Sequence, residues 1–208
     1  LNLMDKNFWH RRWQKNEIGF HMTDPHHFLQ QFFPLLQTQP TDSVFVPLCG
    51  KSPDLVWLRE EGLKVVGIEL SRTAIEAFFN ENDLPGHWTD ETVLPFCSAE
   101  GYKLYCGDFF DLTATEVSGI SAYYDRGALV ALPPEMRVRY VAHMAALMPP
   151  GGRVLLISYS YNQSEMKGPP FSVPQQELEI LFSESFRVEI LSEEDVLRSH
   201  QGLAARGV

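Results

Sequence analysis

VFVPLCGKSPDLVWLREEGLKVVGIELS, residues 44–71, is the stretch of this 208-residue chain that decides its fold. It begins within the first expected strand, Ser43–Val46, and contains a second β-branched run, Lys64–Ile68, near its end. Between them lies a helix that begins at Ser52-Pro53. Serine is a favoured N-cap, and proline is well tolerated at the first helical position. Strand, turn, helix and strand in this order form the half-unit of doubly wound α/β proteins. We therefore predict an α/β fold with a doubly wound, mostly parallel, Rossmann-like sheet in a three-layer αβα arrangement.

An acidic residue follows the second run. Glu69 lies 22 residues after Pro47, which is about the separation at which nucleotide-binding α/β proteins place an acid that binds ribose hydroxyls. A carboxylate accepts such hydrogen bonds better than a neutral side chain does. The alternative is a solvated loop acid, but the strand, turn, helix and strand around Glu69 all agree with the first interpretation. Glu69 is therefore the leading candidate for binding an adenosine-containing cofactor.

The loop between the first run and the helix contains Gly50-Lys51-Ser52, which suggests a phosphate-binding P-loop. That motif also needs a glycine five residues before its second glycine, where this chain has Phe45. The glycine triplet of the dinucleotide fingerprint is missing too. The sequence therefore gives no support to a pyrophosphate held closely against backbone amides.

Composition excludes several other classes of protein. The formal net charge is −10 and the isoelectric point is near 5.1, so binding of nucleic acid through clustered basic residues is disfavoured. The three cysteines have no paired spacing and indicate neither a disulfide framework nor a metal site. No apolar run approaches the ~20 residues that span a bilayer, and no signal peptide is visible. We expect one cytoplasmic domain over residues 1–208, without nucleic-acid or membrane partners.

The rest of the chain supplies further elements and loops. Leu84–Gly101 is expected to be an irregular binding loop or lid, and Tyr161–Pro174 a substrate lid. In the helix Pro134–Leu147 the spacing predicts one apolar side, formed by Val138, Val141, Ala142, Ala145 and Met148. The other expected helices are Asp5–Lys15, one that begins at Asp24-Pro25 with Phe28, Leu29, Phe32 and Phe33 buried, one after Ser71 with Ile75, Phe78 and Phe79 buried, and Gln175–Phe182. The other expected strands are Tyr102–Cys106, Ile120–Tyr124, Arg153–Ser160 and Phe186–Leu191.

Candidate site residues follow these strands, because ligands of open α/β sheets bind outside the carboxyl ends of the strands. Asp108 could reach an adenine amino group with Phe109 beside the ring, although Phe109 could equally be a core residue. Arg126 follows the expected strand Ile120–Tyr124 by two residues. It is either a functional candidate at the same edge or a surface charge at the start of a helix. Trp13, on the first helix, could cover a pocket or pack on the core.

Six segments carry a resemblance to a known family, in family order: FWHRRW…IGFH, VPLCGKSPDLVWL, VVGIELS, YCGDFFDL, YDRGALVAL and GPPFSVP. Over about residues 8 to 191 the chain resembles the bacterial thiopurine S-methyltransferases. The resemblance implies a seven-stranded class I methyltransferase sheet with S-adenosylmethionine as methyl donor. It further implies that residues 5–40 form a helical lid and residues 41–208 the Rossmann-like core. The family continues past a pair like Arg206-Gly207 into a last antiparallel strand, so a closing strand is in doubt here.

Position by position, the resemblance implies a set of site residues. The cofactor contacts are Trp13, Leu48, Glu69 and Arg126, with Asp108 and Phe109 beside the adenine. Phe20 corresponds to an aromatic residue near the substrate. Arg126 could bind the cofactor carboxylate or contact a substrate anion, and no catalytic residue is otherwise expected.

The expected reaction is methyl transfer to the thiol or thiolate of a small aromatic or heterocyclic compound, with S-adenosylhomocysteine as product. An aromatic thiol ionises easily, so no general base is required. Tellurium and selenium compounds, and hence tellurite resistance, are further expectations from the family, as is a monomer. A nicotinamide-dependent oxidoreductase is one alternative, although it should have glycines in place of Leu48, Cys49 and Lys51. A noncatalytic protein that binds S-adenosylmethionine is the other.

Overall fold

The computed structural model describes residues 6–195. Its contacts separate the chain into two compact units. The first comprises the residues up to Asp125 together with Ala146–Leu156, and the second comprises Arg126–Ala145 and the residues from Ile157 onward. The expected single domain, with a lid over residues 5–40 and a core over 41–208, stays a prediction. The family's closing strand follows a pair like Arg206-Gly207, and this part of the chain lies outside the described residues.

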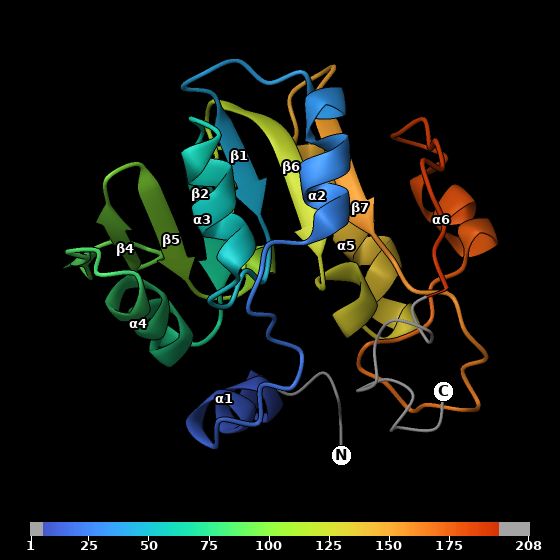
Figure 1. The fold of residues 1–208 in the computed structure, drawn as a ribbon, viewed down its shortest axis with the longest axis horizontal. Coiled ribbons are helices and arrows are strands. Elements are labelled where there is room, and N and C mark those ends of the chain that lie inside the picture. The colour runs from blue at the N-terminus through green and yellow to red at the C-terminus, as the bar shows by residue number, and fades with distance from the viewer. Residues whose placement is uncertain (1–5, 196–208) are drawn as a thin grey trace. The chain divides into compact units, whose positions relative to one another are not determined.

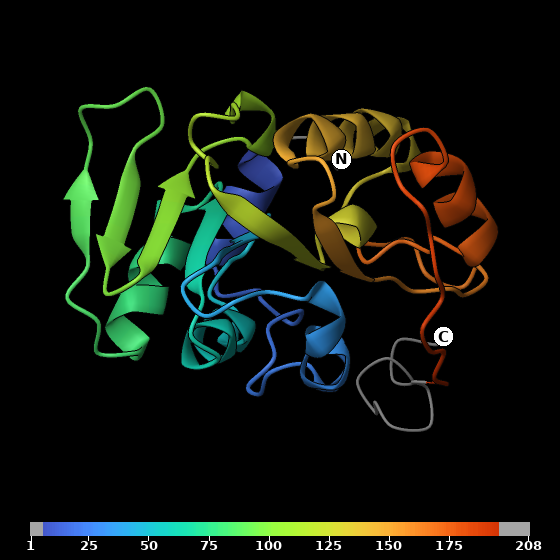
Figure 2. The ribbon, with the colours of Figure 1, turned by 90° about the horizontal axis from the view of Figure 1, so that it is seen from above.

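A sheet of seven strands has the order β3-β4-β5-β2-β1-β6-β7 (Figures 1 and 2). β1 pairs in parallel with β2 and β6, and β2 pairs in parallel with β5. β3, β4 and β5 are antiparallel to one another in turn. The strands are β1 (Ser43–Val46), β2 (Lys64–Glu69), β3 (His87–Thr89), β4 (Phe96–Ala99), β5 (Tyr102–Cys106), β6 (Ile120–Arg126) and β7 (Arg153–Ile157). The predicted α/β fold with a mostly parallel sheet is thereby confirmed, and the carboxyl ends of β1, β2 and β5 meet at one edge.

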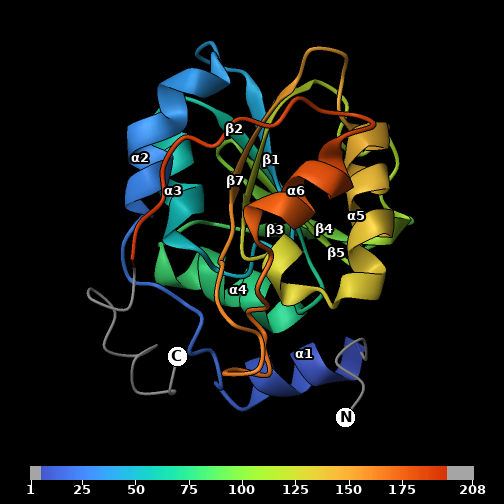
Figure 3. The same cartoon turned by 90° about the vertical axis from the view of Figure 1, so that its right-hand side faces the viewer.

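The first unit holds the helices α1 (Lys6–Gln14), α2 (His27–Phe32), α3 (Pro53–Glu60) and α4 (Arg72–Glu81), with short 3₁₀ turns η1 (Phe33–Leu36) and η2 (Phe109–Asp111). α2, α3 and α4 lie on the same face of its strands (Figures 2 and 3). Ile75, Phe78 and Phe79 of α4 are buried as predicted, and the Phe78 ring packs 5.3 Å from that of Tyr102 on β5. Of the four apolar residues expected to be buried in this region, three lie in α2 and Phe33 begins η1, and only Leu29 is fully buried.

The second unit holds η3 (Leu129–Ala131), most of α5 (Pro134–Leu147) and α6 (Gln175–Phe182). The predicted apolar side of α5 is not the buried side at Val138, which is 67% exposed. The residues buried along this helix are Arg137, Tyr140, Val141, Met144 and Leu147. The buried stripe is displaced because it includes an arginine, which hydrophobic periodicity assigns to solvent.

Two expectations about strands are wrong. Leu84–Gly101, expected to be irregular, contains β3 and β4, which extend the sheet beyond β5. The Arg72 guanidinium lies over the Trp88 ring of β3, 3.8 Å from the centroid of that ring. Local sequence cannot reveal a contact of this kind between distant residues. Phe186–Leu191, expected to be a strand, is irregular and solvent-facing, with Ile190 40% exposed. Alternation alone does not make a strand that lacks a neighbour.

Candidate cofactor site

Three loops meet where β1, β2 and β5 end, and backbone hydrogen bonds join them. The amide of Cys49, in the loop after β1, donates to the Ile68 carbonyl of β2 at 3.0 Å. The amide of Gly107, just after β5, donates to the Glu69 carbonyl at 3.0 Å. Glu69 therefore lies at the centre of this edge, between the ends of two parallel neighbours. This is where α/β proteins of this type bind ligands.

The Glu69 side chain is buried and held by backbone amides. It is 6% exposed. Its Oε2 accepts a hydrogen bond from the Gly50 amide at 3.0 Å, and its Oε1 accepts one from the Ser71 amide at 2.9 Å. Burial raises its pKa to about 7, although hydrogen bonds from Ser71, Gly50 and Leu70 oppose that shift. Each carboxylate oxygen can accept more than one hydrogen bond, so the group could still bind the two hydroxyls of a ribose.

The loop after β1 is shaped by two residues with positive φ, Leu48 at +45° and Gly50 at +53°. A Cβ at position 50 would lie 3.0 Å from the Trp13 ring. Glycine thus permits both the left-handed backbone and the close approach of the indole. The Gly50 amide can then point at Glu69 while Trp13 lies on the outer side of the same residue.

The N-terminal helix α1 contacts two of the three loops. Trp13 is 8% exposed and meets the ring of Phe20 edge-to-face at 5.7 Å, whereas Phe20 itself is 41% exposed. Lys6 pairs with Asp108 at 2.9 Å, and the hydrogen bond to this carboxylate raises the pKa of Lys6. In Figure 1 α1 lies past the carboxyl ends of β1 and β2. The structure thus brings Trp13, Leu48, Glu69 and Asp108 to one edge of the first unit.

The two other candidate residues, Phe109 and Arg126, are not part of this group at the edge of the first unit. Phe109 is 3% exposed, and its ring lies 6.4 Å from that of Phe45 and 5.4 Å from that of Phe110. Its side chain therefore packs in the core, while the place of this residue beside an adenine stays a prediction. Arg126 is the last residue of β6, is half-buried and begins the second unit. Its role toward cofactor or substrate stays a prediction.

Sequence reasoning missed several groups of this site. The amides of Gly50 and Ser71 and the ammonium of Lys6 became visible only in the folded chain. Cys49 is a further neighbour: burial and then the charge of Glu69 raise the pKa of its thiol well above the usual value. Burial and Glu69 also raise the pKa of the Cys106 thiol. Both thiols are therefore held protonated and are poor nucleophiles.

The described part of the chain, residues 6–195, contains no group of three or more His, Cys, Asp or Glu side chains arranged to hold a metal ion. Within the same residues no helix is long and apolar enough to cross a bilayer.

Comparisons with solved structures show the fold. The chain is similar to a methyltransferase from Burkholderia thailandensis, a 1,6-didemethyltoxoflavin-N1-methyltransferase with bound S-adenosylhomocysteine, with a TM-score of 0.58 at 15% identity over 86% of this chain and 75% of that one. A SAM-dependent methyltransferase from Methanosarcina mazei aligns with a TM-score of 0.52 at 16% identity, over 78% of this chain and 84% of that one. The predicted class I methyltransferase fold is confirmed.

Comparisons of sequence show the family. The chain is 45% identical to a thiopurine S-methyltransferase of Nitrosospira multiformis, over 99% of this chain and 93% of that protein. It is 43% identical to one from Pseudomonas fluorescens, over 99% of this chain and 94% of that protein. The sequence profile of the family described as Thiopurine S-methyltransferase (TPMT) matches residues 4–208. The resemblance in the six segments is thus confirmed, and the chain belongs to the thiopurine S-methyltransferase family.

Proposed function

We propose that this chain is an enzyme that transfers a methyl group from S-adenosylmethionine to the thiol or thiolate of a small aromatic or heterocyclic compound of the thiopurine type. Membership of the family and the fold shared with a methyltransferase that binds S-adenosylhomocysteine support this assignment. The observation in the structure that carries it is the buried Glu69 carboxyl, held by two backbone amides at the carboxyl edge of the sheet.

The residues at this edge fit an adenosine cofactor. Glu69 would hold the ribose hydroxyls. At Gly50 a Cβ would lie 3.0 Å from the Trp13 ring, so glycine allows the indole to lie against this loop. Asp108 would hold the adenine amino group, for which it must share its carboxylate with Lys6. Arg126 would bind the cofactor carboxylate or the acceptor anion. When bound, the cofactor supplies the electrophilic methyl group on its sulfonium.

The chain's own residues would then position the acceptor and exclude water. Trp13 and Phe20 supply apolar walls, with Phe20 exposed enough to meet a flat substrate. An aromatic thiol ionises easily near neutral pH, so no dedicated general base is required to remove its proton. The raised pKa values of Cys49 and Cys106 keep the enzyme's own thiols from competing for the methyl group.

Two titrations and one turnover assay test the proposal. Isothermal titration with S-adenosylhomocysteine should show micromolar-range binding, and NAD should not bind. Binding of NAD alone would establish the oxidoreductase alternative. Turnover of an aryl thiol such as 6-mercaptopurine, followed by loss of its thiol absorbance, separates an enzyme from a noncatalytic binding protein, which would bind S-adenosylhomocysteine without turnover.

The finer expectations belong to the same proposal. We propose a cytoplasmic monomer without nucleic-acid partners, in which residues 5–40 act as a lid. The contacts of α1 with Gly50 and Asp108 support the lid. Methylation of selenium or tellurium compounds is a proposed extension, which the same assay tests with an aryl selenol in place of the thiol.

A further inference from the structure

Arg137 is a charged residue in a place that helix and solvation preferences disfavour. It lies in the first turns of α5 and is 1% exposed. A positive charge near a helix N-terminus opposes the helix dipole, and removal of a guanidinium from water is costly unless it is paired. A residue that breaks two local rules at once indicates a positioning or functional role.

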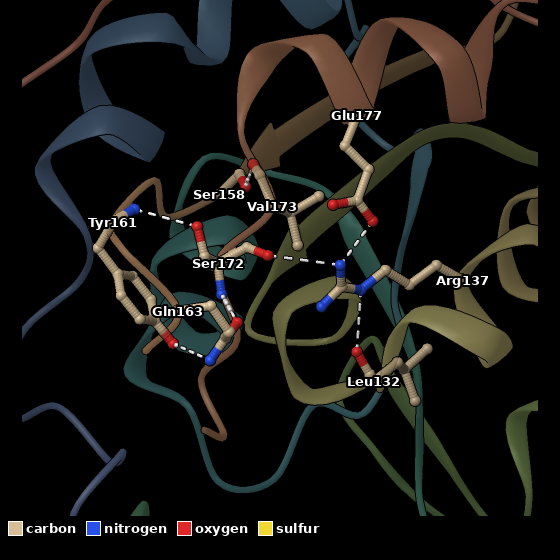
Figure 4. A network of polar contacts seen from close by, with 8 residues as sticks. All are labelled: Leu132, Arg137, Ser158, Tyr161, Gln163, Ser172, Val173 and Glu177. Atoms are coloured by element: carbon tan, nitrogen blue, oxygen red, sulfur yellow. Dashed lines mark hydrogen bonds and ion pairs between the residues drawn. The ribbon is translucent and has the colours of Figure 1, made fainter. Parts of the chain in front are cut away.

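The guanidinium joins three segments of the second unit (Figure 4). Its Nε donates to the Leu132 carbonyl at 3.0 Å, and its Nη1 donates to the Ser172 carbonyl at 3.4 Å. The same Nη1 pairs with the Glu177 carboxylate of α6 at 2.5 Å. Glu177 is the charge that compensates Arg137, and its side chain is 33% exposed. The Nη2 atom is buried and makes no hydrogen bond among the described residues.

Ser172 belongs to the loop Tyr161–Pro174, and its own hydrogen bonds connect it to the other end of that loop. Its amide donates to Gln163 Oε1 at 2.9 Å, and its hydroxyl accepts from the Tyr161 amide at 3.0 Å. Gln163 in turn donates to the Tyr161 hydroxyl at 3.1 Å (Figure 4). The Arg137 guanidinium also lies 5.7 Å from the centre of the Phe171 ring, within cation–π range. The two ends of the loop are thereby joined through one residue, whose carbonyl is held by Arg137.

We propose that Arg137 is a positioning residue, which with Glu177 fixes the loop Tyr161–Pro174 in the conformation that receives the methyl acceptor. This inference rests on the proposed function, in which that loop is the substrate lid. Arg137 acts through Ser172 and touches neither cofactor nor acceptor. The loop is exposed from Asn162 to Glu165, whereas residues 171–173 at its other end are buried. The conformation of the exposed part therefore depends on such attachments rather than on burial.

Substitutions separate positioning from simple stability. Arg137→Met removes the three hydrogen bonds and the charge, Glu177→Gln removes only the compensating charge, and Arg137→Met with Glu177→Met removes both charges. Arg137→Lys keeps the charge but cannot reproduce the planar fork. Glu179→Gln, two residues along α6 on an exposed position, is the matched control. Each variant is tested for its thermal midpoint, KM of the aryl thiol, affinity for S-adenosylhomocysteine, and amide hydrogen exchange of residues 161–173.

We expect Glu177→Gln to lower the thermal midpoint, because it leaves a buried guanidinium without a counter-charge, and the double variant to recover it, because no lone charge remains. Arg137→Met, Arg137→Lys and the double variant should all raise KM for the thiol about tenfold and accelerate exchange in the loop, with affinity for S-adenosylhomocysteine within about twofold of wild type. Glu179→Gln should match wild type throughout.

Recovery of KM together with the thermal midpoint in the double variant would overturn the proposal, since it would reduce Arg137 to a stability element. Wild-type KM in Arg137→Lys would overturn it as well. If wild type turns over no aryl thiol, the proposed function fails by itself. Loop exchange still tests Arg137 in that case, and unchanged exchange in Arg137→Met would refute its positioning role.

Discussion

The ionisation of Glu69 offers the sharpest test of the site, because burial moves its pKa from 4.5 to about 7. A folded-state pKa above the unfolded one means that this group favours the folded state fully only below about pH 4.5, and that the contribution is lost as the pH rises through about 7. The shift corresponds to about 3 kcal/mol in all, of which about 2 kcal/mol falls between pH 5 and 8.

Glu69→Gln is the variant that isolates this effect, because the amide has nearly the same shape and does not titrate. Denaturant unfolding of the ligand-free protein at pH 5, 6, 7 and 8 gives the free energy of unfolding of both proteins. We expect wild type to lose about 2 kcal/mol relative to the Gln variant across that range. A difference that does not change with pH would refute the claim that this carboxyl is buried and held by the Gly50 and Ser71 amides.

The same carboxyl should control cofactor affinity. Ribose hydroxyls donate most strongly to the ionised form, so wild type should bind S-adenosylhomocysteine more tightly as the pH rises from 6 to 8, while Glu69→Gln should show no such trend. Glu69→Ala should weaken binding by about 1.5–3 kcal/mol, and Glu60→Ala, on the exposed end of α3, is the control. Equal affinities in wild type and Glu69→Ala would make Glu69 a bystander.

Three further variants test the surroundings of Glu69. Gly50→Ala should destabilise the fold and weaken binding of S-adenosylhomocysteine, since a Cβ there lies 3.0 Å from Trp13. Gly119→Ala is the control, because Gly119 also has a positive φ but nothing lies within 4 Å of its Cβ. It should show only backbone strain of about 1–3 kcal/mol in chemical unfolding. Phe109→Ala should lower stability by about 3–5 kcal/mol as a core cavity does, with the affinity of the folded fraction unchanged by titration calorimetry; a selective loss of affinity would restore the adenine role of its side chain. Lys6→Ala should change the free energy of unfolding by less than about 1 kcal/mol, as exposed ion pairs do, and a larger loss in chemical unfolding would show that this pair fastens α1.

The sequence by itself determined the half-unit from β1 to β2, the position of Glu69 and the family. The half-unit and the position of Glu69 depend on local patterns, namely β-branched runs, a Ser-Pro helix start, and an acid at a set distance from the first strand. The family was indicated by the resemblance of the six segments. Such local patterns can be recognised without knowing which strands pair, because a parallel strand buried on both faces needs only to be apolar. The residues that follow β1, β2 and β5 therefore meet at one edge of the sheet, as expected from parallel strands.

Only the tertiary structure decided which groups complete that edge. The bonds from Gly50 and Ser71 to Glu69, the pairing of Lys6 with Asp108, and the place of the Phe109 ring in the core all join residues whose distance depends on the path of the whole chain. β3 and β4 likewise depend on distant pairing, since β4 pairs with β5 and β3 pairs with β4. Arg137 shows the physical reason most clearly. Hydropathy places an arginine in water, and only the counter-charge of Glu177, 40 residues away, compensates for the loss of solvation when Arg137 is buried.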